Sequence, residues 1–382
     1  MEFELTGEQE DFRTSVDQWA ERNLAEGARE RAKDSEYPRD VATAMARQGL
    51  LGLTVSEAMG GQGASLMDAV LAIEAVARHC PKSADVIQAG NFGAVRTLAE
   101  YASPDQRERF LAPVLSGRAV LGLGMSEPGA GSAVTDLATT AVVEGDRVLI
   151  NGTKIFSTHS ADADCFLVYV RYGPGIDGIG SVLVERETPG LRIGPPQRFM
   201  SGEQWCELHF EDCAVPASQV LLGPGGFRRQ LSGFNVERLG NAARSLALGR
   251  FAFNEARRYA MVREQFGRPL MEFQGLQWKF AEMLLSLESA QLLLYRAATH
   301  AAGGLPTPSD TALAKLAANT AGFEVANQSL QILGGLGFSE ESLVHYCVLR
   351  TRGWQIAGGS TEMLKNRIAE HVFGRSFSQR AR

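Results

Sequence analysis

One acidic side chain, Glu237, lies near the start of the longest helical pattern in the chain, FNVERLGNAARSLALGRFAFNEARRYAMVREQFG at 234–267. A carboxylate can serve as a general base when it is withdrawn from water and its pKa approaches the working pH. Glu237, Asn241 and Arg244 also form an i, i+4, i+7 row, which is the usual pattern of a solvated helix face. The residues alone therefore leave two interpretations of Glu237 open, a surface charge and a base.

Two other segments combine side chains that suit a flat, polar ligand. In MSEPGAGS at 125–132, a glycine-rich turn lets backbone N–H groups approach a ligand, and Ser126 and Ser132 add hydroxyl donors. In KIFST at 154–158, an aromatic ring stands beside a hydroxyl at the end of a strand pattern. Each segment also has an ordinary interpretation, the first as a strand-to-loop turn and the second as a core Phe beside a capping Thr.

The elements that must position these residues change character twice along the chain. Patterns from Thr6 to about Leu111 are helical, and the runs between about Ala119 and Leu222 are short, β-branched or alternating, with turn residues between them. Helical patterns return from Gly226. This order excludes a Rossmann chain, whose strands would alternate with helices. We therefore expect an α+β protein with an all-α N-terminal domain at 1–118, a β-barrel or sandwich at 119–225 and a four-helix-bundle-like domain at 226–382.

The composition narrows the classes of partner. The chain has 382 residues, 45% of them hydrophobic and 21% charged, and a formal charge of −6, which argues against nucleic acid as the main partner. Its five cysteines form no CxxC pair and its six histidines no HExxH spacing, so we expect no disulfide framework and no metal site. We also expect no signal peptide and no membrane span, and hence a cytoplasmic protein.

Several separated segments, taken together and in order, resemble the acyl-CoA dehydrogenase family of flavoproteins along the whole chain. The helix–β–helix order predicted above is also the architecture of that family. The segments are GLLGLTVSEAMGGQG near residue 50, MSEPGAGS at 125–132, NGTKIFSTHSADAD at 151–164, VREQFGRPLMEFQGLQ at 262–277, QILGGLGF at 331–338 and IAGGSTEMLKNRIAEHVFG at 356–374.

The resemblance implies an FAD site. Positions of the family that contact the flavin ring match Met125, Ser126, Phe156 and Thr158. Positions through which a neighbouring subunit holds the ADP half match Arg263, Phe266, Gln331, Gly334 and Gly335. The segment that closes over the cofactor matches Ser360 to Glu362, and Ser132 matches a position near the CoA portion of the ligand. Two ordinary interpretations remain here as well: Arg263 and Glu264 as a surface ion pair, and QILGGLGF as a helix end followed by a turn.

The resemblance also bears on the base. In most members a Glu in the C-terminal motif removes the α-proton of the acyl thioester, but the matching residue here is Gly358. A minority, which includes the isovaleryl- and long-chain-type enzymes, carries the base on the long helix, at a tetrad that matches Val236-Glu237-Arg238-Leu239. Glu237 is therefore the predicted base, and Arg238 and Gly358 are predicted to border the substrate. Arg238 either positions the ligand or pairs with a nearby acid.

The implied activity is FAD-dependent α,β-dehydrogenation of an acyl thioester on CoA or on an acyl-carrier protein. Electrons would leave to an electron-transfer flavoprotein, and the chain would form a homotetramer or dimer. Departures from the family pattern at Ala133, at Leu349-Arg350 and at Phe156 suggest a specialised substrate. Three alternatives stay open: a flavin monooxygenase or oxidase, an enoyl-thioester reductase, and a non-catalytic flavoprotein that binds acyl thioesters.

Overall fold

The computed structural model describes residues 4–157, 159–301 and 304–379. They divide into two compact units. The first unit comprises the described residues up to Lys33, Ser65–Gln88 and those from Asn235 onward, and the second comprises Asp34–Ala64 and Ala89–Phe234. The division falls within two helices, α5 (Ala84–Asn91) and α9 (Phe227–Val262).

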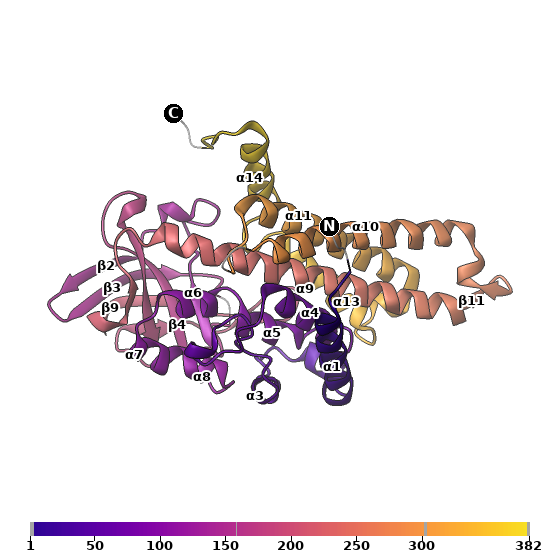
Figure 1. Cartoon of the computed structure of the whole chain (residues 1–382), viewed down its shortest axis with the longest axis horizontal. Coiled ribbons are helices and arrows are strands. Elements are labelled where there is room, and N and C mark those ends of the chain that lie inside the picture. The colour runs from indigo at the N-terminus through magenta and orange to yellow at the C-terminus, as the bar shows by residue number, and fades with distance from the viewer. Residues whose placement is uncertain (1–3, 158, 302–303, 380–382) are drawn as a thin grey trace. The chain divides into compact units, whose positions relative to one another are not determined.

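The first unit is helical (Figure 1). Several of its helices begin at side-chain caps that the sequence provides. Thr6 and Gln9 form a capping box at the start of the helix Gly7–Leu24, and Ser65 and Asp68 form another at the start of the helix Leu66–Ala77. The helices besides α5 and α9 are α1 (Gly7–Leu24), α2 (Ala28–Lys33), α4 (Leu66–Ala77), α10 (Gln274–Thr299), α11 (Pro308–Leu333), α12 (Gly335–Phe338), α13 (Leu343–Trp354) and α14 (Thr361–Phe373).

Helix α9 has 36 residues, and the predicted bounds of 234–267 are wrong at both ends. The helix runs through Gly233, where a Cβ would lie 2.6 Å from Oγ1 of Thr97, so this glycine permits close packing and does not end the helix. At the other end, β11 (Glu264–Gln265) and β12 (Arg268–Pro269) form a hairpin. Its turn residues Phe266 and Gly267 have φ values of 51° and 77°, as a two-residue type I′ turn requires.

Glycines bring α9 and α11 together. A Cβ on Gly249 would lie 2.8 Å from Cα of Gly322, and a Cβ on Gly322 would lie 2.3 Å from the carbonyl oxygen of Ser245. Real Cβ atoms do not approach other atoms so closely, so the two backbones are in direct contact here. This contact brings Lys315, two turns earlier on α11, towards the N-terminal half of α9.

A half-buried chain of polar side chains joins α4 to α10. The hydroxyl of Tyr295 donates to Oε2 of Glu74 over 2.6 Å and accepts a hydrogen bond from Gln291 over 2.7 Å. Arg250 of α9 extends the chain by donating to Gln291 over 2.5 Å. Burial raises the pKa of Glu74 to about 7, against the opposing effects of the Tyr295 hydrogen bond and the nearby Arg250.

The second unit combines short helices with a sheet. An eight-stranded sheet has the strand order β10-β5-β4-β2-β3-β9-β6, and β1 pairs in parallel with β4. The helices are α3 (Arg39–Arg47), α6 (Ala94–Tyr101), α7 (Pro104–Gln106) and α8 (Ala112–Leu115). The strands are β1 (Leu121–Gly124), β2 (Thr140–Glu144), β3 (Arg147–Lys154), β4 (Cys165–Arg171), β5 (Ile179–Glu185), β6 (Leu191–Ile193), β9 (Leu208–Pro216) and β10 (Val220–Leu222), with a separate pair, β7 (Gln197–Arg198) and β8 (Gln204–Trp205).

Alternating residues of these strands form the core of the second unit. Phe166, Val168 and Val170 of β4 pack with Val182 and Val184 of β5 in one buried cluster. The opposite face of the same strands, with Leu167 and Leu183, packs with residues of α6 and α8. A sheet that is covered on both faces explains why β4 and β5 are apolar along almost their whole length.

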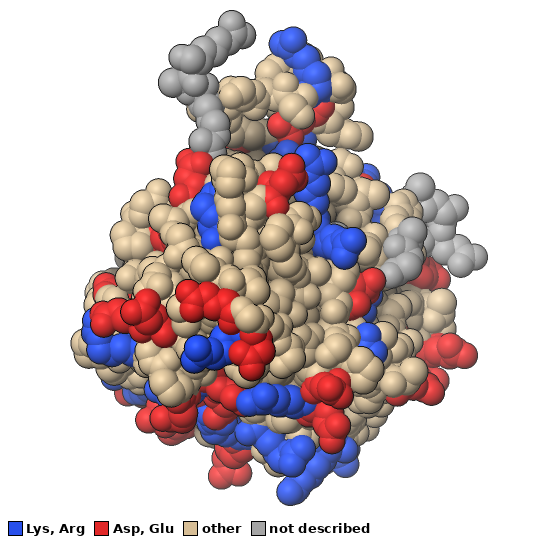
Figure 2. Space-filling view, turned by 90° about the vertical axis from the view of Figure 1, so that its left-hand side faces the viewer, with Lys and Arg blue, Asp and Glu red and all other residues tan. Residues whose placement is uncertain are grey.

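Where the structure describes the chain, the charged side chains on one face of the molecule and the five cysteines show no cluster of one kind of charge and no disulfide. On the face shown in Figure 2, acidic and basic side chains are interspersed, in keeping with the formal charge of −6. All five cysteines, Cys80, Cys165, Cys206, Cys213 and Cys347, are free and buried. No helix in the described part of the chain is long and apolar enough to cross a membrane.

Candidate active site

The first unit encloses the proposed base. Glu237 stands on α9, half-buried, and its Oε1 atom accepts two hydrogen bonds. One comes from Nε2 of Gln88 on α5 over 2.6 Å, and the other from Nδ2 of Asn241, one turn further along α9, over 3.2 Å. Among the described residues, no hydrogen bond is made to Oε2 of Glu237.

The surroundings of Glu237 shift its proton affinity. Burial raises the pKa of Glu237 to about 7, even though Arg244, the Gln88 hydrogen bond and Lys315 favour the charged form. Asp85 contributes in the same direction as burial because two nearby carboxylates disfavour each other's ionisation. A carboxylate with this pKa can exchange a proton near neutral pH.

The helix row that contains Glu237 is buried, so the interpretation of it as a solvated face is wrong. Asn241 is buried and Arg244 is only 2% exposed. Arg244 pairs with Asp85, donates to Oε1 of Gln88 over 2.8 Å, and stacks over the ring of Trp354 at 4.0 Å. Arg350, one of the departures from the family pattern, also pairs with Asp85, at 3.3 Å, and stacks on the same ring at 4.7 Å.

The loop that carries Gly358 is held by two cations. Nζ of Lys315 donates to the carbonyl oxygens of Trp354, Ala357 and Gly359 over 3.0, 2.9 and 3.0 Å, and Nε of Arg238 donates to that of Gly358 over 3.0 Å. Burial lowers the pKa of Lys315 to about 7, while its three acceptors match the three donors of an ammonium group. The structure thus brings Glu237, Arg238 and Gly358 together, and Arg238 binds the loop and Asn235.

No side chain fits at Gly358 without displacement. Its φ is +70°, a value that residues with a Cβ rarely adopt, and a Cβ would lie 2.7 Å from Nδ2 of Asn241. That nitrogen is the one that donates to Glu237. The absence of a carboxylate at 358 and the placement of one at 237 are therefore parts of one local arrangement.

In the second unit, a buried ion pair positions the turn that follows β1. Nζ of Lys154 lies 2.7 Å from Oε1 of Glu127 and also donates to the carbonyl oxygen of Met125 over 3.3 Å. Burial lowers the pKa of Lys154 to about 8. Burial works to raise the pKa of Glu127, but Lys154 and the backbone N–H of Ala138 together hold it below its ordinary value. The backbone N–H of Ile155 donates to the carbonyl oxygen of Ser126 over 2.9 Å, so the turn with Met125 and Ser126 lies beside the segment with Phe156.

Phe156 is not a core residue, since 53% of it is exposed, and the interpretation of it as core is wrong. Its φ of +52° is strained for a residue with a side chain. Its ring lies 4.5 Å from Trp205 and 6.2 Å from Phe199, and the hydroxyl of its neighbour Ser157 is buried with no hydrogen-bond partner among the described residues. An exposed aromatic face beside such a hydroxyl fits a flat, polar ring. Ser132 is exposed, and Thr158 lies outside the described residues.

The residues predicted to hold the ADP half lie at exposed turns of the first unit. Arg263 directly follows α9, and Phe266, 95% exposed, is in the hairpin turn. Gln331 is exposed near the end of α11, Gly334 caps that helix, and a Cβ on Gly334 or Gly335 would meet nothing within 4 Å. The QILGGLGF segment thus contains the end of α11, its glycine cap and the four-residue helix α12, and its backbone at Gly334 and Gly335 is open to a ligand. Ser360 precedes α14, and Glu362 lies in its first turn.

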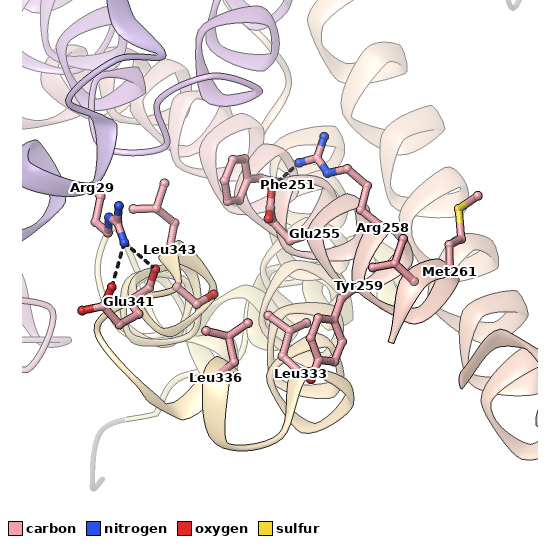
Figure 3. Close-up of a pocket in the computed structure, with 12 residues that line it drawn as sticks. Arg29, Phe251, Glu255, Arg258, Tyr259, Met261, Leu333, Leu336, Glu341 and Leu343 are labelled. Carbon is pink, nitrogen blue, oxygen red and sulfur yellow. Dashed lines mark hydrogen bonds and ion pairs between the residues drawn. The ribbon is translucent and has the colours of Figure 1, made fainter. Parts of the chain in front are cut away.

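A pocket of about 610 Å³ lies between the end of α9 and the α11–α12 turn (Figure 3). Phe251, Tyr259 and Leu333 line it. The ion pairs Arg29–Glu341 and Arg258–Glu255 also belong to its lining. None of the described residues predicted for the site lines this pocket. It is therefore separate from the surroundings of Glu237.

Comparison with known proteins identifies the family. Family models described as the N-terminal, middle and C-terminal domains of acyl-CoA dehydrogenase match residues 6–118, 122–213 and 224–373. The short-chain specific acyl-CoA dehydrogenase of Clostridium acetobutylicum is 32% identical, over 98% of this chain and 100% of that protein. The chain belongs to the acyl-CoA dehydrogenase family. The predicted family, fold class, FAD cofactor and acyl-CoA dehydrogenation are thereby confirmed.

Two further relatives show the breadth of this acyl-CoA dehydrogenase family. The butyryl-CoA dehydrogenase structure from Megasphaera elsdenii matches with a TM-score of 0.90 and 30% identity, over 98% of this chain and 100% of that chain. The 3-sulfinopropanoyl-CoA desulfinase of Paraburkholderia xenovorans is 32% identical, with 99% of each chain covered. Sequence identity of 30–32% is therefore shared by a relative named as a dehydrogenase and by one named as a desulfinase.

Gln88, Trp205 and Lys315 lie near the predicted site residues, but they were not predicted from the sequence. Gln88 lies 149 positions before Glu237, and nothing local marks it as a partner. Trp205, which contacts Phe156, lies in a short strand far along the chain. Lys315 did carry a signal, because it is a lone cation in the apolar pattern TALAKLAANT of a buried helix. A buried Lys requires several acceptors, and here they are loop carbonyls.

Proposed function

We propose that Glu237 is the base with which this protein removes the α-proton of an acyl-CoA thioester during α,β-dehydrogenation. The observation that carries the proposal is the combination of a carboxylate whose pKa is raised to about 7 with a neighbouring Gly358 that leaves no room for the usual acid. A general base works best when its pKa lies near the operating pH. Breaking the α-C–H bond transfers the proton to the carboxylate, most directly to Oε2, since Oε1 is already held by two amides.

FAD supplies, when bound, the acceptor for the hydride that leaves the β-carbon. We propose that Met125, Ser126, Phe156 and Thr158 hold its flavin ring. The buried ion pair Lys154–Glu127 supports this role for Met125, Ser126 and Phe156. It holds the turn after β1, and this turn lies beside the exposed ring of Phe156. The ADP half would be held by Arg263, Phe266, Gln331, Gly334 and Gly335 of a neighbouring subunit, with Ser360 and Glu362 at the start of the closing helix. Arginine suits a pyrophosphate because its charge is permanent and its donors form a fork.

For the substrate, we propose that Arg238 and Gly358 border the acyl thioester and that Ser132 lies near its CoA portion. Arg238 and Lys315 place two cations around the loop at 354–359, where they would favour negative charge on a reacting thioester. Acyl chain length stays open. A thioester on a carrier protein is the second substrate form to test.

We also propose a homo-oligomer, either a tetramer or a dimer. Helix α10 exposes Trp278, Leu285 and Leu292, which are spaced seven residues apart and therefore lie on one face, together with Leu284. An exposed apolar stripe of this kind on a surface helix is typical of an interface. An electron-transfer flavoprotein is the proposed acceptor of the two electrons.

Two further predictions stay proposals. The domain boundaries 1–118, 119–225 and 226–382 are supported by the change from helices to strands after α8 and back to a helix at α9. A cytoplasmic location is supported by the five buried free thiols, which suit a reducing compartment.

The test of the base is anaerobic flavin reduction by a panel of acyl-CoA and acyl-carrier thioesters, followed at the oxidised flavin band. Glu237→Gln should retain FAD and lower the reduction rate by about 10²–10⁴-fold with every thioester, because that range is what a general base contributes. Glu324→Gln, an exposed site on α11, is the matched control and should react normally. An unchanged rate in Glu237→Gln would show that the base lies elsewhere.

The same panel, together with an oxygen-consumption assay, separates the alternative functions. Rapid oxygen consumption with NADH would favour a flavin monooxygenase. A yellow protein that no thioester reduces would favour a non-catalytic role.

A further inference from the structure

A chain of hydrogen bonds fixes the orientation of one side chain that faces Glu237. Gln88 is buried, and its amide contacts Glu237 through one end and Arg244 through the other. A guanidinium only donates hydrogen bonds, so the end of the amide that faces Arg244 must be its oxygen. The amide nitrogen consequently faces Glu237, where it donates over 2.6 Å to Oε1.

Arg244 is itself immobilised. It pairs with Asp85, which lies on α5 three residues before Gln88 and hence on the same helix face. It also stacks over the ring of Trp354 at 4.0 Å. Asp85 thus orients Arg244, and Arg244 orients the amide of Gln88. The first and the last members of this sequence of contacts, Asp85 and Gln88, thus both lie on α5.

We propose that Gln88 is a positioning residue for the base: it binds one oxygen of the Glu237 carboxylate, stabilises the ionised form, and leaves the other oxygen to accept the proton. This inference rests on the proposed role of Glu237. No sequence motif points to Gln88. Its amide nitrogen also donates to Oδ1 of Asn241 over 3.3 Å, and the hydrogen bond of Asn241 to the same carboxylate oxygen, at 3.2 Å, is longer than that of Gln88.

Glu237 is surrounded by charged groups of both signs, and the amide of Gln88 is a hydrogen-bond donor that carries no charge. Asp85 on α5 disfavours ionisation of Glu237, while Arg244 on α9 and Lys315 on α11 favour it. Two further cations lie nearby. Arg238 on α9 donates to the carbonyl oxygen of Gly358, and Arg350 on α13 pairs with Asp85. An amide adds a hydrogen bond to this balance without adding a charge. Removal of that hydrogen bond should therefore raise the pKa of Glu237 and leave the charge balance otherwise intact.

The experiment measures the protonation of Glu237 directly, in the FAD-loaded enzyme without substrate. The infrared carbonyl band of the protonated acid is isolated by difference against Glu237→Gln and followed over pH. In Gln88→Met, which has a similar length but no donor, the midpoint should rise by about one to two pH units, as expected for a lost hydrogen bond to a charged group. Gln328→Met removes a glutamine on α11 that binds Lys279, and it should leave the midpoint unchanged.

The rate of flavin reduction gives a second reading. If Glu237 is the base, the pH profile of anaerobic reduction in Gln88→Met should shift upward with the infrared midpoint, so that the rate lost near neutral pH returns at higher pH. If the infrared midpoint rises but the rate profile does not follow it, the hydrogen bond from Gln88 to Glu237 is established, but Glu237 is not the base and Gln88 does not act on the reaction. An infrared midpoint equal to that of the wild type would overturn the inference.

A second variant covers a failure of Gln88→Met to fold. Gln88→Glu keeps the size and the acceptor for Arg244 but places a second carboxylate against Glu237. The two acids should titrate as a pair, with the higher midpoint above that of wild-type Glu237, because like charges disfavour each other. A midpoint at or below the wild-type value would again contradict a direct contact between the two side chains.

Discussion

Nε of Arg238 donates to the carbonyl oxygen of Gly358 over 3.0 Å, so the residue that follows the proposed base binds the loop position from which the usual base is missing. Lys315 binds the carbonyl oxygens on either side, those of Ala357 and Gly359. Three successive loop carbonyls are thus held by two cations from α9 and α11. These contacts hold the loop at Gly358, where φ is +70°.

Gly358→Ala should disturb the base without touching it. The new Cβ would meet Nδ2 of Asn241 at 2.7 Å and would require a strained φ of +70°, so we expect a loss of about 1–3 kcal/mol of stability. Displacement of Asn241 should also remove its hydrogen bond to Glu237 and slow anaerobic flavin reduction. Thermal unfolding and stopped-flow reduction measure the two effects. Gly353→Ala, in α13 with open space around its Cβ, is the control and should unfold no earlier than the wild type.

Lys154→Met should release the turn that carries Met125 and Ser126. It leaves the Glu127 carboxylate buried without its cation, which costs about 3–5 kcal/mol in comparable pairs. We expect a lower unfolding temperature and a lower ratio of bound FAD to protein, measured by absorbance. Adding Glu127→Gln should recover part of the stability, because the remaining buried charge is then removed. Lys279→Met breaks one hydrogen bond, to Gln328, and should change little.

Glu74→Gln should stabilise the protein only at higher pH. The pKa of Glu74 is raised from 4.5 to about 7, so the wild type loses stability between these two values as the unfolded chain releases a proton that the folded chain retains. The variant avoids this loss. Near pH 5 the two proteins should unfold alike, and above pH 7 the variant should be more stable by about 1–2 kcal/mol, after allowance for partial solvent access.

The unfolding temperatures of both proteins across this pH range test the prediction. Gln at 74 can still accept the Tyr295 hydrogen bond. Glu282→Gln, exposed on α10, should show no such pH-dependent difference. A Glu74→Gln effect that is equal at pH 5 and pH 8 would mean that the substitution acts through packing and not through the charge.

Leu285→Glu should dissociate the proposed oligomer. Leu285 is 69% exposed in the apolar stripe of α10, so a charge there costs nothing in a monomer but would be buried in an interface. Light scattering after size exclusion should report a smaller assembly, with FAD partly lost if a neighbouring subunit holds the ADP half. Val143→Glu, at a residue of β2 that is 59% exposed, should leave the mass unchanged.

The sequence predicted the architecture well because the change of pattern from helix to strand and back is strong and long. It failed at the ends of α9 for physical reasons. Gly233 resembles a helix boundary but instead permits the approach of Thr97, and the hairpin after Val262 depends on a non-glycine residue, Phe266, at positive φ. Sequence patterns do not reveal either feature, because each depends on tertiary context.

For the candidate site, the sequence supplied the residues that belong to motifs and missed those that only geometry brings together. Glu237 was predicted because Gly358 has no side chain to act as a base. Gln88 was not, since its contact with Glu237 joins two helices that are 149 positions apart. Arg244 belongs to a row whose ordinary interpretation is a solvated face, yet Asp85 and Trp354 enclose it. Burial of a charged row requires partners from other helices, and these lie beyond the reach of a helical period.

The burial of all five cysteines has a practical consequence for site-specific labelling. The thiolate is the reactive form of cysteine, and burial raises the pKa of Cys165 to about 12 and that of Cys213 to about 11. Burial also raises the pKa of Cys206 and of Cys347, and Cys80 is buried as well. A single cysteine introduced on the surface, for example at Val143, should therefore react with a maleimide dye long before the native thiols do. The native chain can thus accept a fluorescent or spin label at a chosen position without prior removal of its own cysteines.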